Sequence, residues 1–230
     1  MKITSCGVGS HRSILLVEDD SLLRDLLARM LEGAGFIVET AATAADAAHV
    51  FHRCDPDGVI LDVDLGRGPN GFDLADALLR RSPSTAILFL TNLPDPRFAN
   101  RTSESLPSGI GYLRKSALSD ADTLITAIDD VLRGHISSGV RHDRDPLRPM
   151  ASLTHKQVDV LKLVADGKSN AQIAEIRGIS VKSVEDTISR ACLTLGIDPV
   201  TEPNTRVAAV RRFLSATGRA APDVPEVFRE

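Results

Sequence analysis

Hydrophobic residues recur along this chain in two rhythms, one up to about residue 133 and the other after about residue 151. In the first part, short unbroken apolar runs alternate with segments whose apolar residues recur at the spacing of one helix face. Such alternation predicts an α/β fold with a doubly wound, five-stranded parallel sheet. The predicted strands are 14–17, 36–38, 59–61, 86–90 and 110–113, and the predicted helices are 21–31, 44–51, 72–79, 96–105 and 118–132, the last with Ser119 as its N-cap.

The second rhythm is purely helical. Thr154 with Gln157 and Ser169 with Gln172 have the spacing of capping boxes, which predicts that a helix begins at each pair. Ser180 is placed to cap a third helix that runs to residue 195, and a fourth helix is expected over about 206–214. We therefore predict a flexible N-terminal extension (1–12), an α/β domain (13–133), a Gly-, Ser- and Pro-rich linker (134–151), a small all-α domain (152–216) and a flexible tail (217–230).

Charge and composition narrow the class of protein. Residues 13–133 hold 19 acidic and 11 basic residues, whereas residues 152–216 hold 7 acidic and 9 basic residues, so the two parts favour different partners. The three cysteines, Cys6, Cys54 and Cys192, form no Cys-x-x-Cys pair, which favours reduced thiols over a zinc site or a disulfide framework. Residues 1–12 have no apolar core of a signal peptide, and no apolar run could span a membrane, so we expect a cytoplasmic protein.

Polar residues that can do chemistry stand directly after the predicted strands. Because the carboxyl ends of parallel strands share one edge of the sheet, these residues should converge. Clustered carboxylates repel one another and need a cation, for which Mg²⁺ is suited, while a lysine and a hydroxyl could bind phosphoryl oxygens. Taken singly, such acidic residues are ordinary solvated loop residues, but together they indicate a phosphoryl-transfer site with a carboxylate nucleophile. They are Glu18, Asp19 and Asp20 after the first strand, Asp62 and Asp64 after the third, Thr91 after the fourth and Lys115 after the fifth.

These residues stand in motifs that resemble the receiver domain of two-component response regulators, which has a flavodoxin-like fold. The matching segments are LLVEDDSLLR, VILDVDLG, FLT and GYLRKS, spread over 13–133. The resemblance implies that Asp62 is the phosphoacceptor, that Thr91 is the switch hydroxyl and Tyr112 the switch aromatic residue, and that Lys115 is the conserved lysine of the family. It also implies Mg²⁺ bound by Asp19, Asp62 and the backbone carbonyl of Asp64, with Glu18 acting through water.

The match has three departures from the family pattern. Asn92 follows the switch threonine where a small residue is usual, Ser116 replaces the usual proline after Lys115, and the loop after Asp62 is slightly long. They bear on the lifetime of the phosphoryl group and on the shape of the switching face.

A competing interpretation starts from Asp62-Val63-Asp64. This motif after an apolar strand also resembles the first motif of haloacid-dehalogenase-type phosphatases, and Asp129-Asp130 could mimic their acidic pair. However, those two aspartates fall inside a predicted helix, and Glu18 and Asp19 would have no role. The receiver interpretation accounts for all of these residues.

The second part of the chain resembles the LuxR-type helix-turn-helix domain, through LTHKQVDVLKLVADGKSNAQIAEIRGISVKSVEDTIS and the closing LGI. Family placement makes residues 181–195 the recognition helix, which enters the major groove of DNA. Glu185 and Asp186 are unusual there because phosphates repel carboxylates, although a carboxylate can accept a hydrogen bond from cytosine N4. The candidate DNA contacts are Lys168, Lys182, Ser183, Glu185, Asp186, Ser189 and Arg190, with Arg206 also suited to a phosphate.

Together the two resemblances imply a transcriptional regulator and not an enzyme. Its expected partners are a histidine kinase, DNA and a second copy of the chain on activation, with RNA polymerase as a further candidate and no membrane. In an alternative interpretation, the helical domain is a protein-interaction output with weak or no DNA binding, and Glu185 and Asp186 face a basic partner.

Overall fold

The structure is a computed structural model that describes residues 12–217. The predicted N-terminal extension, apart from Arg12, and the predicted tail beyond Thr217 lie outside the described residues. Contacts divide the chain into two units, each of which is made of two separate stretches of the sequence. Of the described residues, the first unit holds 12–91 together with Pro107–Arg141, and the second holds Asn92–Leu106 together with 142–217.

A five-stranded parallel sheet forms the centre of the first unit, with the strand order β2-β1-β3-β4-β5. This confirms the α/β fold predicted from the unbroken apolar runs. Every residue of β3 is buried, because in a parallel sheet with both faces covered each side chain of a central strand points into a core. The strands are β1 Ser13–Val17, β2 Ile37–Ala41, β3 Gly58–Leu61, β4 Ala86–Thr91 and β5 Ile110–Arg114.

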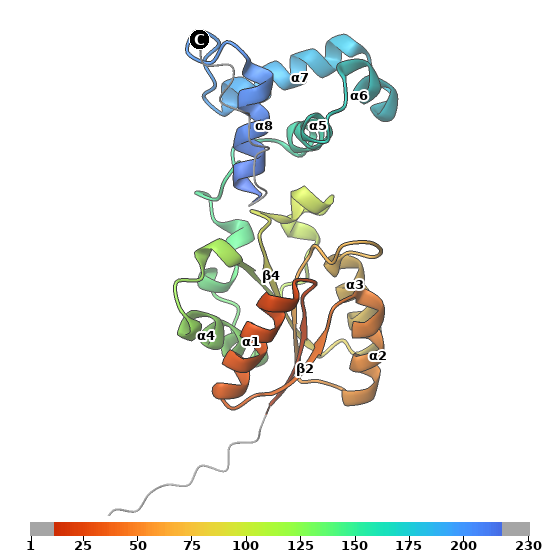
Figure 1. The fold of residues 1–230 in the computed structure, drawn as a ribbon, viewed down its shortest axis with the longest axis vertical. Coiled ribbons are helices and arrows are strands. Elements are labelled where there is room, and N and C mark those ends of the chain that lie inside the picture. Colours follow the sequence, from red (N-terminus) through yellow and green to blue (C-terminus); the bar gives the residue numbers. More distant parts are fainter. Residues whose placement is uncertain (1–11, 218–230) are drawn as a thin grey trace, which may run out of the picture. The chain divides into compact units, whose positions relative to one another are not determined.

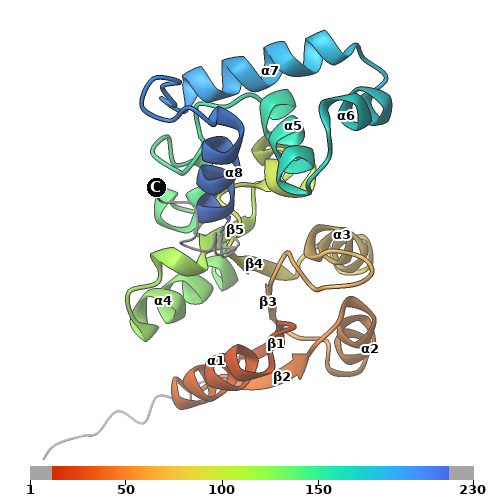
Figure 2. The same ribbon diagram turned by 45° about the horizontal axis from the view of Figure 1, so that its top comes forward.

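Helices cover both faces of this sheet (Figures 1 and 2). Alternate strand residues such as Leu88 and Leu90 share a core with α1 and α4 on one face. Phe89, which lies between them, points to the other face and packs edge-on against Phe72 of α3, with 4.7 Å between ring centroids. The helices of this unit are α1 Ser21–Gly33, α2 Ala44–Cys54, α3 Gly71–Arg81 and α4 Ala121–Leu132.

The start of α4 corrects one prediction. Asp120, and not Ser119, is the N-cap, because the Asp120 carboxylate accepts a hydrogen bond from the Thr123 backbone N–H at 2.8 Å. Ser119 instead donates its hydroxyl to the Asp120 carboxylate at 3.1 Å. Both residue types are good caps, so local sequence did not distinguish them.

The second unit is built around four helices, α5 His155–Ala165, α6 Asn170–Arg177, α7 Val181–Thr194 and α8 Thr205–Ala216. Both predicted capping boxes are present at the starts of α5 and α6, and Ser180 caps α7. Gly178 takes the left-handed backbone conformation between α6 and α7, with φ of 63°, which lets the chain turn sharply there. The result is the helix-turn-helix arrangement that the capping pattern indicates.

Two stretches differ from a simple helix and a simple linker. Residues 96–105 form two 3₁₀ turns, Pro96–Ala99 and Ser103–Ser105, in place of one helix, because Asn100 between them has a φ of 60°. Residues 134–151 carry two further 3₁₀ turns, Ser138–Val140 and His142–Arg144, and bury the side chain of Asp143.

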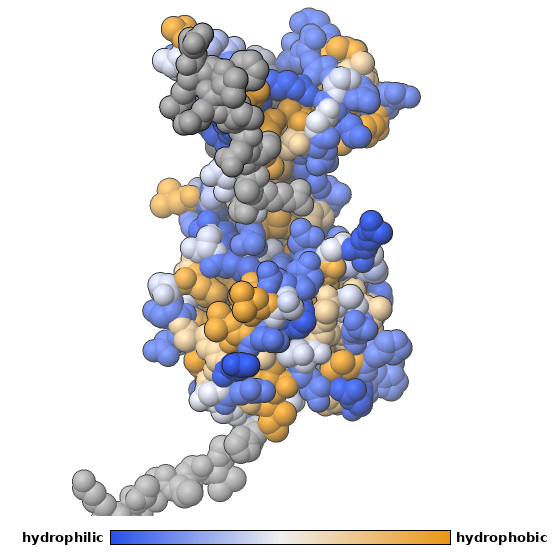
Figure 3. All heavy atoms as spheres, viewed as in Figure 1, coloured by the Kyte–Doolittle hydropathy of each residue, from blue (hydrophilic) through white to orange (hydrophobic). Residues whose placement is uncertain are grey.

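Helix α1 leaves part of its apolar surface exposed. Leu22 is 80% exposed and Leu26 is 63% exposed, one helical turn apart. Figure 3 shows hydrophobic side chains gathered where α1 lies in Figure 1. Within residues 12–217, no helix has the length and apolar character needed to cross a lipid bilayer.

Candidate functional site

Four strands of the sheet end side by side, and each delivers a polar residue to the same edge. Glu18 and Asp19 follow β1, Asp62 follows β3, Thr91 ends β4, and Lys115 follows β5. The register pairs Val17 with Leu61, so Glu18 and Asp62 leave neighbouring strands at the same level. The convergence expected from the sequence is therefore present in the fold.

Lys115 joins two of these carboxylates. Its ammonium Nζ donates to Glu18 Oε2 at 2.6 Å and to Asp62 Oδ2 at 2.7 Å. Glu18 is 2% exposed and Asp62 is 5% exposed, so both charges are shielded from water and depend on the lysine for compensation. One ammonium between two buried carboxylates leaves a net negative charge at this edge, which favours a cation.

Burial and neighbouring charges shift the pKa values of Glu18 and Lys115. Burial, the largest effect, raises the pKa of Glu18, and the Asp62 carboxylate adds to it, although the hydrogen bond from Lys115 opposes both. Burial on its own would lower the pKa of Lys115, but the carboxylates of Asp62 and Glu18 outweigh it and raise that pKa. The lysine therefore stays charged at neutral pH.

Three carboxylates at this edge are close enough to share one cation. Ligand oxygens of Glu18, Asp19 and Asp62 lie within 4.8 Å of one another. Oxygen donors of this kind fit a hard divalent cation. Asp64 is exposed and lies outside this group of three, and its backbone N–H donates to Asp62 Oδ1 at 3.2 Å.

Arg24 supports the site without any mark in the sequence pattern, and Asp20 has a different role from the one its position suggested. Arg24 lies in the first turn of α1, and its guanidinium donates to the backbone carbonyl of Glu18 at 2.7 Å. This bond holds the backbone of the acidic loop in place. Asp20, which the sequence placed with the acidic residues, caps α1 by accepting from the Leu23 N–H at 2.9 Å. An aspartate three residues before an N–H donor at a helix start is a signal that could have separated this structural role from metal binding.

Gly71 holds the backbone of Asp62 closely. Its N–H donates to the Val63 carbonyl at 2.9 Å, and a Cβ atom at this position would lie 2.2 Å from the Asp62 carbonyl oxygen. No side chain fits there, so the loop after β3 and the start of α3 can meet only at a glycine.

We expect Gly71→Ala to shift the Asp62 backbone and to cost about 1–3 kcal/mol in the free energy of unfolding, the usual range for overpacking. Urea denaturation of the full chain measures this loss. The matched control is Gly33→Ala, where an added Cβ would meet nothing within 4 Å and where a change below about 1 kcal/mol is expected. Equal effects of the two variants would contradict the close approach at Gly71.

The two predicted switch residues are both buried in the first unit. Thr91 is 1% exposed, and Tyr112 of β5 is fully buried. The Tyr112 ring lies 6.2 Å from the ring of Phe89, centroid to centroid. The phosphatase alternative requires Asp129 at the site, but its Oδ1 lies 2.9 Å from Nη2 of Arg12. Arg12 precedes the start of β1, so Asp129 lies at the opposite end of that strand from Glu18. The Asp129-Asp130 pair that this alternative requires therefore does not lie beside Asp62.

The predicted DNA contacts lie on α7 and the turn before α6. All seven, Lys168, Lys182, Ser183, Glu185, Asp186, Ser189 and Arg190, are exposed. The ammonium Nζ of Lys182 lies 3.2 Å from Oδ1 of Asp186, so the positive and negative charges of these two side chains offset each other. Among residues 12–217, Glu185 forms no ion pair, and it is therefore the uncompensated negative charge on this helix surface. Arg206 donates to the Lys168 carbonyl and to Asn170 Oδ1, so it braces the start of α6.

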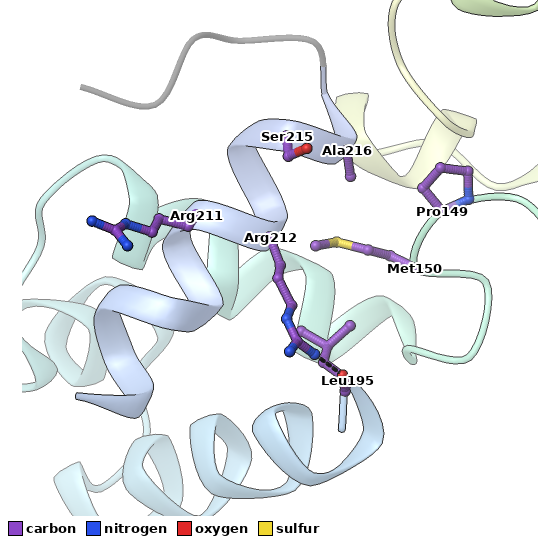
Figure 4. A pocket seen from close by; sticks show the side chains of 7 residues that line it. All are labelled: Pro149, Met150, Leu195, Arg211, Arg212, Ser215 and Ala216. Atoms are coloured by element: carbon purple, nitrogen blue, oxygen red, sulfur yellow. Dashed lines mark hydrogen bonds between the residues drawn. The ribbon is translucent and has the colours of Figure 1, made fainter. Parts of the chain in front are cut away.

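A separate hollow of about 520 Å³ lies beside α8. Figure 4 shows that Met150 extends toward α8 and that Arg212 bonds to the Leu195 carbonyl. None of the predicted site residues lines this hollow, so it belongs to the packing around α8 and not to the acidic site.

Comparison with known proteins agrees with both parts of the chain. Residues 14–129 match the response regulator receiver domain, and residues 151–198 match the LuxR family of bacterial regulatory proteins. The nitrate/nitrite response regulator NarP of Escherichia coli (strain K12) is 29% identical over 222 residues, covering 89% of this chain and 95% of NarP. The transcriptional regulatory protein LiaR of Bacillus subtilis (strain 168) is 25% identical over 199 residues, covering 82% and 93%.

A solved structure of the RcsB response regulator of Salmonella typhimurium has a similar fold, with a TM-score of 0.54 at 18% identity, over 90% of this chain and 98% of RcsB. The strand order, the acidic cluster at the sheet edge and the two family matches lead to one conclusion. The chain belongs to the response regulator family, as a two-component transcriptional regulator, and not an enzyme, with a receiver domain and a LuxR-type helix-turn-helix DNA-binding domain.

Proposed function

We propose that a histidine kinase transfers a phosphoryl group to Asp62 of this regulator and that this transfer controls DNA binding by the helical domain. The observation that carries the proposal is the Lys115 ammonium between Glu18 and Asp62, beside three carboxylates that can share a cation. A nucleophilic carboxylate, a fixed positive charge and a cation site together match the needs of phosphoryl transfer.

Mg²⁺ is the cation we propose, because it prefers oxygen ligands and is commonly shared with phosphate. Asp19, Asp62 and the backbone carbonyl of Asp64 would hold it, with Glu18 acting through water. When bound, the ion neutralises negative charge on the carboxylates and on the incoming phosphoryl group.

The residues of this chain perform the remaining tasks. A carboxylate oxygen of Asp62 attacks the phosphorus of phosphohistidine, an O–P bond forms, and the P–N bond breaks with its electron pair left on the imidazole. Lys115 already contacts Asp62 and can donate to the new phosphoryl oxygens without a large movement. The Thr91 hydroxyl, at the end of the neighbouring strand, supplies a second donor.

The output is a shift between two arrangements of the protein. Phosphorylation replaces one carboxylate charge with about −1.5 to −2 and adds three acceptor oxygens, which draw Thr91 and Lys115 toward the phosphoryl group. Tyr112 is proposed to respond to the movement of Thr91 and to reshape the surface near β5, which favours a homodimer. Family placement supports this, and the fold is shared with a structure of two RcsB dimers bound to two parallel DNAs.

We propose that α7 enters the major groove, with Lys182, Ser183, Glu185, Asp186, Ser189 and Arg190 near the bases and Lys168 near a phosphate. RNA polymerase is a further proposed partner, and the cytoplasm is the proposed location.

Labelling with acetyl phosphate in Mg²⁺ tests the phosphoacceptor. Intact mass should rise by one phosphoryl group, and peptide mapping should place it on Asp62. Chelation of Mg²⁺ should prevent the incorporation. A stable label on another residue, or equal labelling with and without the chelator, would contradict this proposal.

Glu185→Lys tests the role of α7. Two units of charge change at a proposed DNA surface, so affinity should rise, the sequence preference should change, and the slope of log affinity against log salt should steepen by about 1. Selection of bound genomic fragments measures the preference, and titration at several salt concentrations measures the slope.

The matched control is Glu32→Lys, which makes the same charge change at an exposed position of α1. It should leave the sequence preference unchanged. If the wild-type chain retains no DNA, and Glu185→Lys loses a protein partner instead, the helical domain is a protein-interaction output.

A further inference from the structure

The segment Asn92–Leu106 joins two strands of the receiver sheet, yet its contacts place it in the C-terminal unit. The chain therefore passes between the two units three times, after Thr91, after Leu106 and after Arg141. The first two of these passages leave and re-enter the sheet at β4 and β5, which carry the switch residues Thr91 and Tyr112.

A buried carboxylate fastens this segment. Asp95 is fully buried, and its Oδ2 lies 2.6 Å from Nη2 of Arg97 and 2.8 Å from Nε of Arg148. Arg97 also donates to the backbone carbonyls of Met150, at 3.1 Å, and Leu153. Since a buried charge must be paired, this network locks the segment to the chain that leads into α5.

An aromatic side chain adds a hydrophobic anchor. Phe98 is 5% exposed and belongs to the same core as α5, α7 and α8, and its ring lies 5.3 Å from that of Phe213. The Pro96–Ala99 turn packs against α5, which can be followed in Figures 1 and 2. Lys162 of α5 donates to Asn100 at 3.2 Å, and Ser103 donates to the Asp143 carbonyl at 3.2 Å. The helix-turn-helix core is thus completed by residues that lie within the receiver sequence.

The connection from Thr91 to this anchor is short and contains a proline. Only Asn92, Leu93 and Pro94 separate Thr91 from Asp95, and Pro96 follows. The two prolines fix their own φ angles and restrict the residues before them. A displacement of Thr91 therefore has to pass along only three residues to reach Asp95.

We propose that residues 92–106 are a latch through which the phosphoacceptor site controls the DNA-binding unit. Movement of Thr91 toward a phosphoryl group on Asp62 pulls on Asp95, loosens its bonds to Arg97 and Arg148, and weakens the hold of the segment on α5 and α8. The latch rests on the proposed function, because it needs phosphorylation of Asp62 as its input.

Amide hydrogen exchange of the full chain tests the latch, with and without acetyl phosphate in Mg²⁺. Exchange in residues 93–106 and 148–164 should rise several-fold on phosphorylation of the wild type and should not change in Asp62→Asn. Two latch variants, Arg148→Gln and the milder Phe98→Leu, should show raised exchange in these peptides without phosphodonor and little further rise with it. Leu147→Ala, at a residue that is 90% exposed in the same unit, should behave as wild type.

The outcomes separate the two proposals. Phosphoryl incorporation at Asp62 with unchanged exchange in 93–106 and 148–164 would overturn the latch and leave the proposed function standing. Lack of incorporation would overturn both together. Latch variants that exchange as slowly as wild type would show that the segment does not hold the C-terminal unit, whatever the phosphorylation result.

Discussion

Asp62→Asn should take up no phosphoryl group from acetyl phosphate in Mg²⁺, whereas the wild-type chain becomes labelled. The amide is not a nucleophile, and neither Glu18, which is held by Lys115, nor exposed Asp64 is expected to replace it. Intact mass spectrometry measures the incorporation.

The same variant should retain its stability. Replacing Asp62 removes one of three clustered carboxylates, while Lys115 keeps its bond to Glu18 at 2.6 Å. Relief of the repulsion should offset the lost ion pair, so the midpoint of thermal unfolding should stay level or rise. Asp25→Asn is the matched control: its side chain is exposed on α1 and lies outside the acidic cluster, so labelling should continue. Labelled Asp62→Asn, or unlabelled Asp25→Asn, would contradict the assignment.

Asp95→Ala should lower the free energy of unfolding of the C-terminal unit by about 3 kcal/mol or more, because it leaves two largely buried guanidinium groups without their counter-ion. The side chains of Arg97 and Arg148 are only 12% and 16% exposed. Urea denaturation followed by a probe in this unit measures the loss. Glu175→Ala, at an exposed position of α6, should cost less than about 0.5 kcal/mol.

The contribution of Asp95 should also depend on pH. Burial, the largest single effect, raises the pKa of Asp95, but the bonds and charges of Arg97 and Arg148 outweigh it and hold this pKa below its ordinary value. A lowered folded-state pKa gives a stabilisation that is complete above the unfolded value of about 3.9 and that is lost as pH falls through the folded value. The stability difference between wild type and Asp95→Asn should therefore be constant from about pH 5 to 7 and shrink below about pH 4. A difference that shrinks as pH rises from 5 to 7 would contradict this sign.

Much of the receiver site could be predicted because its parts depend on local rules. Unbroken apolar runs mark the parallel strands, and the residues after those strands must meet at one edge. Glu18, Asp62, Thr91 and Lys115 could be placed together on that basis, and Lys115 indeed bonds to two of the others. The helical domain was predictable for a similar reason, because capping residues bond within a single turn of their own helix.

The predictions failed where a local pattern allowed two solutions. Ser119 and Asp120 are both competent caps, and only the orientation of the chain entering α4 selects Asp120. Residues 96–105 have a weak helical pattern, but Asp95 and Phe98 are committed to partners more than 50 residues away, and the segment follows those contacts. Contacts between residues so far apart in the sequence do not change the local hydrophobic periodicity, so the periodicity cannot predict them.

Apart from the helix expected over 96–105, the succession of strands and helices could be derived from the sequence alone, as could the caps that start α5, α6 and α7 and the set of residues at the carboxyl edge of the sheet. These follow from side-chain period, backbone capping and strand direction, each of which acts over a few residues. Two features follow from packing alone: Gly71 lies against the Asp62 carbonyl, and Asn92–Leu106 belongs to the C-terminal unit. The first depends on how closely α3 packs against the end of β3, and the second on the buried charges that Asp95 pairs with Arg97 and Arg148, and neither is settled before the whole chain packs.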